Sequence, residues 1–95
     1  MDIRKDKDGD DLIIALDGEI DLRVWPQLDE LAEELRGHEG PVIVDGSAIT
    51  FCDSVALRFF VAVRSTVHDL RLRTPSRELE VVLDSAGLLD AFHRE

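Results

Sequence analysis

Cysteine, aromatic residues and basic residues are all scarce in this 95-residue sequence. The single cysteine, Cys52, has no partner for an internal disulfide, and no set of Cys and His residues has zinc-site spacing. Eleven Lys and Arg against 21 Asp and Glu give a net charge of -10, which argues against binding to nucleic acids or anionic membranes. A protein with a basic face is the partner that such a chain suits electrostatically.

Long apolar segments are missing as well. The sequence has no run of 18 apolar residues, and residues 1–6 lack the apolar stretch of a signal peptide. We therefore expect a cytoplasmic protein with no membrane contact. Hydrophobic residues make up 44% and charged residues 34% of the chain, which is typical of a folded globular protein. The length corresponds to one domain, covering 1–95.

Strand and helix patterns alternate along the chain. Apolar or alternating segments predict strands over 12–16, 42–44 and 70–73, with Ile3 and its neighbours as a polar edge strand. Asp17-Gly18 is expected to end the first apolar strand. Apolar residues at helical spacing predict helices over 25–35, 54–68, 77–86 and 88–92. The alternation predicts an α/β architecture with a mostly parallel sheet.

The most informative segment is 42–54, an apolar strand, a turn that opens on Asp45, and then Asp53-Ser54 before an apolar helix. Ser54 is expected at or next to the helix N-terminus, where exposed N–H groups and the helix dipole favour an anion. The residues leave two interpretations open. The hydroxyl is either an ordinary helix cap or a phosphoacceptor.

Catalytic and metal-binding patterns are weak. The helix spacing places His68 about 20 Å from Ser54. His38 falls in an expected loop and His93 near the C-terminus, so a serine nucleophile has no evident base. The paired carboxylates of Asp45 and Asp53 are a poor basis for a magnesium site, and no glycine-rich phosphate loop is present. We therefore expect no enzyme activity, no cofactor and no bound metal.

Several stretches of the chain form an ordered set. They are Leu16-Asp17-Gly18-Glu19-Ile20-Asp21, a strand ending in Asp45 and followed by Ser47, Phe51-Cys52-Asp53-Ser54, and Leu83-Asp84-Ser85-Ala86-Gly87-Leu88. In this order and spacing they resemble the STAS domain, which bacterial anti-sigma-factor antagonists share with the cytoplasmic tails of sulphate transporters. The resemblance covers roughly residues 11–92.

The resemblance implies a mixed, mostly parallel sheet of four to five strands flanked by about four helices, and regulation by partner switching without catalysis. In such antagonists an anti-sigma-factor kinase phosphorylates the serine after the aspartate, here Ser54, and a phosphatase reverses the modification. The unmodified form binds the kinase and frees the sigma factor. The alternative is a STAS subunit that does not switch, in a lipid-transport complex or a stress-signalling scaffold. The family usually continues with Ser and Gly, where this chain has Val55 and Ala56.

The same match predicts a partner-binding surface around Ser54. Its expected residues are Asp21, Asp45, Ser47, Asp53, Val55, Arg58 and Phe59. The helix from Ser54 has more apolar positions than one buried stripe needs. We therefore expect one of Phe59 and Phe60, or a neighbouring valine, to be exposed beside Ser54, with Arg58 and Arg64 at the border.

Overall fold

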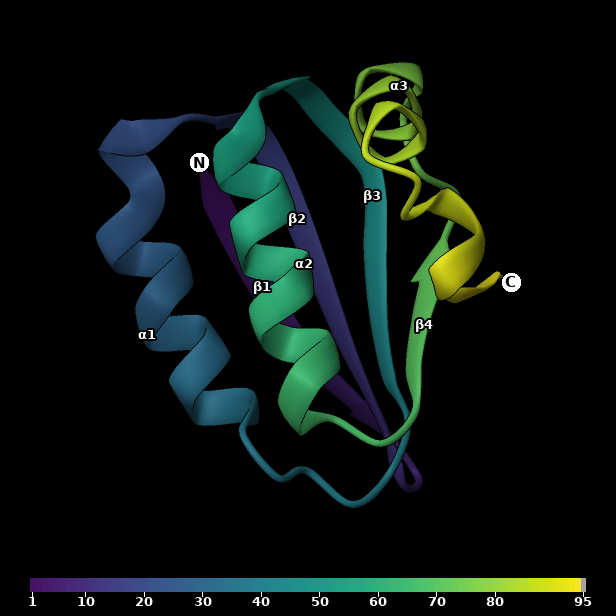
Figure 1. The fold of residues 1–95 in the computed structure, drawn as a ribbon. Coiled ribbons are helices and arrows are strands. Elements are labelled where there is room, and N and C mark those ends of the chain that lie inside the picture. The colour runs from purple at the N-terminus through teal and green to yellow at the C-terminus, as the bar shows by residue number, and fades with distance from the viewer. Residues whose placement is uncertain (95) are drawn as a thin grey trace.

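A five-stranded sheet with strand order β1-β2-β3-β4-β5 forms the frame of the molecule (Figure 1). The structure, a computed structural model, describes residues 1–94. The strands are β1 (Asp2–Asp8), β2 (Asp11–Ile20), β3 (Val42–Cys52), β4 (Leu70–Arg73) and β5 (His93–Arg94). β1 runs antiparallel to β2, and each later strand is parallel to the one before it. The prediction of a mixed, mostly parallel sheet is confirmed.

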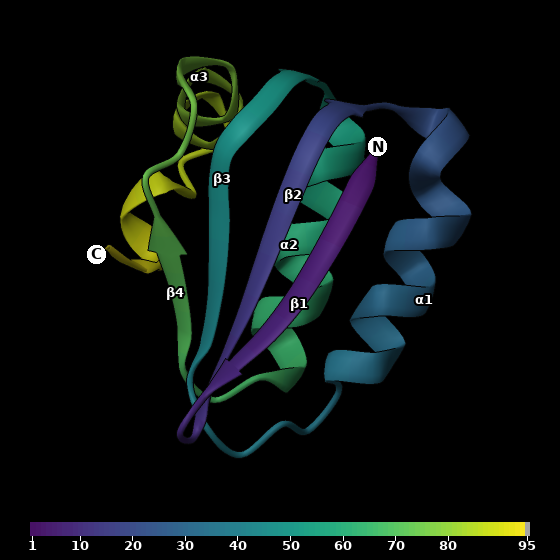
Figure 2. The same ribbon diagram turned by 180° about the vertical axis from the view of Figure 1, so that it is seen from behind.

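Three α-helices and two short 3₁₀ turns complete the described part of the chain. They are η1 (Leu22–Val24), α1 (Trp25–Leu35), α2 (Ser54–Thr66), α3 (Arg77–Ser85) and η2 (Leu89–Ala91). α1 and α2 lie side by side over one face of the sheet, while α3 lies near the C-terminal end of β3 (Figure 1). Seen from behind, the other face of the sheet has no helix of the described residues over it (Figure 2). Within those residues, no helix has both the length and the apolarity needed to cross a bilayer.

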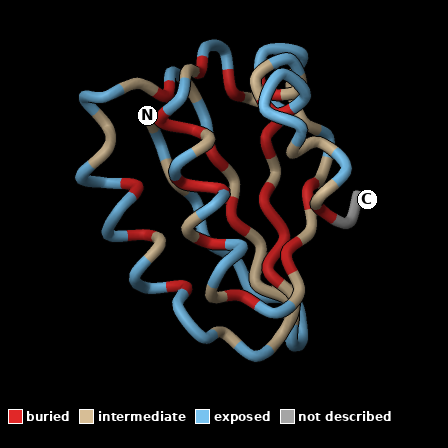
Figure 3. Tube along the Cα trace, in the orientation of Figure 1, coloured by how far each residue is buried: buried red, intermediate tan, exposed pale blue. Residues whose placement is uncertain are grey.

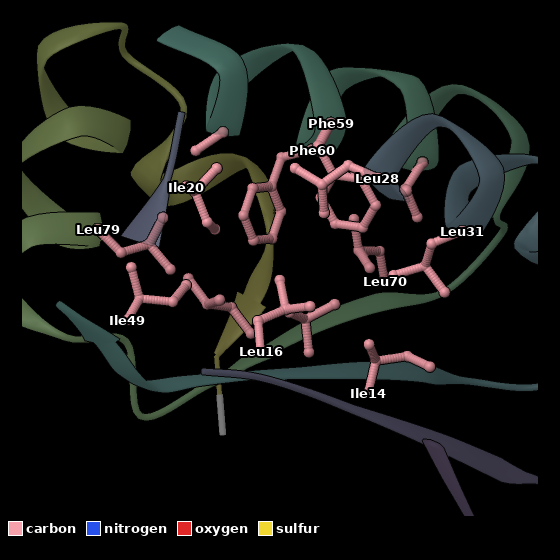
Figure 4. Packing of buried hydrophobic residues seen from close by; sticks show 14 of the residues in the cluster. Ile14, Leu16, Ile20, Leu28, Leu31, Ile49, Phe59, Phe60, Leu70 and Leu79 are labelled. Atoms are coloured by element: carbon pink, nitrogen blue, oxygen red, sulfur yellow. The ribbon is translucent and has the colours of Figure 1, made fainter. Parts of the chain in front are cut away.

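Buried hydrophobic side chains pack between the sheet and the helices (Figure 4), and the buried positions recur along both the strands and the helices (Figure 3). Phe59 and Phe60 of α2 are both fully buried, with ring centroids 5.4 Å apart in an edge-to-face arrangement. α2 contacts α1 and α3, and its buried side chains join those of the sheet in one core cluster, so it buries more than one stripe of side chains. The expectation that Phe59 contacts a partner is therefore wrong, and the expected exposed aromatic on α2 is absent among the described residues.

Two strands continue beyond their predicted ends. β2 passes through Gly18 to Ile20, and β3 runs to Cys52, so the expected turn from Asp45 to Ser54 is wrong. These extensions pair with each other, and Ile20 lies opposite Cys52. Two register shifts leave extra residues on β3, as in β-bulges. The bulges explain how an Asp-Gly-Ser sequence that is typical of a turn fits inside a strand.

The chain's last elements also differ from expectation. The expected helix over 88–92 is only the 3₁₀ turn η2, and α2 ends at Thr66 rather than near residue 68. β5 follows η2 as a two-residue strand beside β4 and was not predicted from the sequence. Two residues are too few for a periodic pattern to be recognised.

Gly46 sets how closely α3 approaches β3. It is buried, and a Cβ at this position would lie 2.6 Å from Cδ2 of Leu79 on α3. The Gly46 carbonyl also accepts a hydrogen bond from the backbone N–H of Ser76 (2.9 Å). Ser76 in turn caps α3, because its hydroxyl accepts from the Leu79 N–H at 3.2 Å. The missing side chain at position 46 therefore lets α3 start directly against the strand.

Candidate functional site

Ser54 is the first residue of α2 and is exposed to solvent, as predicted. The N-cap is Asp53, whose Oδ1 accepts from the Val55 N–H (2.9 Å) and whose carbonyl accepts from the Ala56 N–H (3.0 Å). The Ser54 hydroxyl makes no hydrogen bond to any residue that the structure describes. The capping role left open by the sequence therefore belongs to Asp53, and Ser54 presents a hydroxyl that the fold does not use.

Asp21 and Asp53 leave the sheet side by side. β2 and β3 are parallel with Ile20 opposite Cys52, so the residues that follow these two start from neighbouring strand ends. Asp21 caps the turn η1, where its Oδ1 accepts from the Arg23 N–H at 3.0 Å. The predicted grouping of these two acids at one rim is thus present in the structure.

The Asp21 carboxylate is already paired with a cation. Nη2 of Arg23 lies 2.6 Å from its Oδ2, and Nε donates to the same carboxylate at 3.1 Å. The Arg23 side chain also reaches Glu19 at 3.2 Å. These hydrogen bonds lower the pKa of Asp21 below its ordinary value and raise the pKa of Arg23. The acidic edge expected here is therefore partly neutralised.

Asp45 and Ser47 do not lie at the rim formed by Asp21 and Asp53. Both are inside β3, where Oδ1 of Asp45 accepts from the Ser47 N–H (2.9 Å) and Asp45 pairs in register with Ala15 and Arg73. Strand rise alone places Asp45 roughly 20 Å from the end of β3. The expectation that Asp45 borders Ser54 is wrong, because the segment between them is extended rather than folded back in a turn.

The exposed side of α2 continues from Ser54 through Arg58 and Val61, which follow it by four and seven residues. Val61 is 50% exposed, so α2 does carry an exposed valine, although it lies about two helical turns from Ser54 rather than beside it as expected. Val55 is buried, and its predicted direct contact with a partner is wrong for the same reason as that of Phe59. The guanidinium carbon of Arg58 lies 4.2 Å from the centroid of the Trp25 ring, a cation–π contact with α1.

Three exposed apolar side chains were not predicted from the sequence: Leu22 (68% exposed), Phe51 (48%) and Val81 (58%). Leu22 follows Asp21, and Phe51 lies three residues before Ser54. Phe51 and Val81 line a groove of about 290 Å³ between the end of β3 and α3, with Cys52, Arg77, Glu78 and Val82. The signal available in the sequence was Phe51, an aromatic residue inside the motif that ends in Ser54.

Cys52 is one of the residues that line this groove, and its thiol is buried. Its Sγ donates to the carbonyl of Glu78 at 3.4 Å. Burial, followed by the charges of Asp53 and Glu78, raises the pKa of the Cys52 thiol to about 11. The thiol therefore stays protonated at neutral pH and packs as a small apolar group.

No group that could hold a metal ion, with three or more His, Cys, Asp or Glu side chains, occurs in residues 1–94. His38 follows α1 and His68 follows α2, so both lie at the end of the helices away from Ser54. The geometry around Ser54 thus offers a hydroxyl, carboxylates, a guanidinium and apolar side chains. These groups suit a protein-binding surface.

Comparison with known proteins shows the family to which the chain belongs. Residues 3–92 match the family described as Mlab, STAS domain, and the chain therefore belongs to the STAS domain family. No curated protein matches the sequence significantly.

Solved structures show the same fold at low sequence identity. An anti-sigma factor antagonist from Mycobacterium paratuberculosis is 18% identical, with a TM-score of 0.87 over 98% of this chain and 83% of that one. The anti-sigma factor antagonist SpoIIAA in its unphosphorylated form is 16% identical, with a TM-score of 0.73 over 99% of this chain and 88% of that one. The predicted STAS-like fold is confirmed.

Proposed function

We propose that this STAS domain is an anti-sigma-factor antagonist that binds an anti-sigma-factor kinase while Ser54 is unmodified and releases it once Ser54 is phosphorylated. The observation that carries the proposal is the exposed Ser54 hydroxyl, which makes no hydrogen bond to any described residue. The neighbouring Asp53 already caps the helix, so the hydroxyl is not needed for that role. Two structural neighbours are described as anti-sigma factor antagonists, which supports this choice among STAS functions.

In the proposed modification the kinase transfers the γ-phosphoryl group of ATP to Oγ of Ser54. A new P–O bond forms at the serine, the bond to the ADP leaving group breaks, and the hydroxyl proton passes to a base of the kinase. The phosphate adds about -1.5 to -2 charges at pH 7 beside Asp53. A phosphatase restores the serine by hydrolysis. Because Asp53 rather than Ser54 caps α2, the fold tolerates modification, and the added charge acts on the partner.

The surface around Ser54 has the composition of a reversible protein interface. Leu22, Phe51 and Val61 are exposed apolar side chains on the elements that begin or end near Ser54 or continue from it, and Arg58 and the Asp21–Arg23 pair supply charged groups on the same elements. An apolar centre with a charged edge is typical of such interfaces. The overall charge of -10 favours a partner with a basic face and disfavours nucleic acid.

A second candidate is a STAS subunit that binds its partner constitutively. Val55 and Ala56 stand where the family usually has Ser and Gly, and this departure favours that candidate. Both side chains are buried, so the exchange changes the packing beneath Ser54 and leaves its exposed hydroxyl in place. Phosphorylation separates the two candidates, since the constitutive subunit stays unmodified.

The test is incubation of the protein with the anti-sigma-factor kinase of its organism and ATP, followed by mass spectrometry and an affinity measurement. We expect one phosphate on Ser54, at least tenfold weaker binding of the phosphorylated protein, and an unmodified, binding-competent Ser54→Ala variant. Ser65→Ala is the matched control, because Ser65 is exposed near the other end of α2. Equal affinities of phosphorylated and unmodified protein would refute the switch.

A further inference from the structure

Arg58 is held on the surface by an aromatic ring. Its guanidinium lies 4.2 Å from the centre of Trp25, the single tryptophan of the chain. It forms no ion pair or hydrogen bond with any residue in 1–94. The ring attracts the cation through its quadrupole, which at an exposed site is a weak interaction. The contact can therefore be exchanged for a stronger one.

Ser54 lies one helical turn before Arg58. Residues four apart on a helix are surface neighbours, and a long side chain leans back over the turn that precedes it. An anion at the earlier position with a cation four residues later is also the more favourable order for an ion pair. The Arg58 side chain is thus within reach of a group attached to Ser54 Oγ.

Three groups near this position are already engaged. The N–H groups of Val55 and Ala56 donate to Asp53. Arg23, the cation of the neighbouring rim, is bound to the carboxylates of Asp21 and Glu19. Arg58 is the cation on the same helix face whose charge no carboxylate of the described residues neutralises.

We infer that Arg58 is the positioning residue for a phosphate on Ser54, and that phosphorylation transfers its guanidinium from the Trp25 ring to the phosphate. This inference rests on the proposed modification of Ser54. Charge-assisted, bidentate hydrogen bonds from a guanidinium to a phosphate are stronger than an exposed cation–π contact, so the exchange is favourable.

The exchange changes the partner surface at two points. It removes the Arg58 charge from the partner's reach by pairing it within the chain, and it uncovers one face of the indole on α1. A partner that binds the unmodified surface then meets a different charge and a different shape, although the backbone of the fold is unchanged. Release in this scheme depends on a side-chain movement as well as on repulsion.

The test uses protein with phosphoserine incorporated at position 54 during translation, so it needs no kinase. In the unmodified protein the Arg58 side-chain protons over the indole face are shielded by its ring current. We expect phosphoserine at 54 to move these NMR resonances toward their unshielded positions and to shift Trp25 fluorescence to longer wavelength. In ³¹P titrations the second pKa of the phosphate should be roughly 0.15–0.4 units higher in Arg58→Gln than in the parent protein.

Arg58→Lys should restore most of the phosphate pKa, since a lysine can also pair with it. Phosphoserine at Ser65, about 10 Å along the helix from Arg58, is the matched control and should leave Trp25 unchanged. Unmoved Arg58 resonances together with a phosphate pKa insensitive to Arg58→Gln would overturn the inference, whatever the partner does. Undiminished partner binding by the phosphorylated protein would instead refute the proposed function and leave the side-chain exchange standing.

Discussion

The close contact between β3 and α3 lets us predict how much Gly46→Ala changes the free energy of unfolding. An alanine there places a methyl group 2.6 Å from Leu79 Cδ2, so the fully buried Leu79 side chain must shift within the packed core to admit it. Overpacking of this kind costs about 1–3 kcal/mol. The smaller conformational entropy of unfolded alanine offsets about 0.4–1 kcal/mol of that cost. We therefore expect Gly46→Ala to lower the free energy of unfolding by about 1–2 kcal/mol.

Removal of Leu79 Cδ2 should abolish or reverse the destabilising effect of Gly46→Ala. Leu79→Ala alone should cost about 2–5 kcal/mol because it leaves a cavity. In that background the new methyl group meets no Cδ2, and Gly46→Ala should be neutral or stabilise by about 0.5 kcal/mol. The coupling between the two sites should therefore be about 1–3 kcal/mol, the range found for residues in contact.

The assay is urea unfolding followed by Trp25 fluorescence and far-UV circular dichroism, with midpoints compared at constant slope. Leu83→Ala is the matched background, because Leu83 is equally buried one turn further along α3 and is not among the nearest neighbours of the added Cβ. There Gly46→Ala should keep its full cost. The same change in stability in all three backgrounds, or a more stable Gly46→Ala single variant, would refute the claim that the contact between position 46 and Leu79 limits the packing of α3 against β3.

Other predictions concern the rim. Asp53→Ala should lower the free energy of unfolding by about 1 kcal/mol through loss of the cap, while Asp53→Asn should lose much less, both measured by urea titration. The Cys52 thiol should resist iodoacetamide at pH 8 until the protein unfolds. Because its pKa is raised from 9.0 to about 11, its contribution to stability should be complete below pH 9 and be lost between pH 9 and 11, and Cys52→Ala should remove that dependence. Arg23→Gln should raise the NMR-detected pKa of Asp21; the stabilisation from this pair is present above the ordinary value of 3.8 and is lost as the pH falls through the lowered pKa. Val61→Ala should weaken partner binding in calorimetry without lowering the melting temperature, since Val61 is half exposed.

The sequence was sufficient for the elements whose pattern is local. α1 has apolar residues at three- and four-residue spacing, and the predicted range 25–35 agrees with the observed helix. The start of α2 at Ser54 follows from an acidic cap before an apolar run, and that pattern also located the candidate site. Local sequence decides these features because caps and amphipathic spacing act within one or two turns.

Features that depend on distant residues could not be predicted in this way. Asp45-Gly46-Ser47 is a turn-like sequence, and it remains in β3 because β2 pairs with it and because α3 requires a glycine there. Phe59 and Phe60 point in different directions from α2, and both are buried because helices lie on both sides of α2. Tertiary contacts that no single segment contains therefore determined the length of β3 and the exposed surface of α2.

The alternation of charged residues along β1 has a consequence for how the molecule meets other chains. β1 is the outer strand on one side of the sheet, and six of its seven residues, Asp2 and Arg4–Asp8, are charged and exposed. An edge of this kind discourages a foreign strand from extending the sheet, since lysines and aspartates would lose water to allow the pairing. The β1 edge should therefore resist strand-to-strand aggregation at high concentration, and a specific partner is expected to recognise side chains rather than to add a strand beside β1.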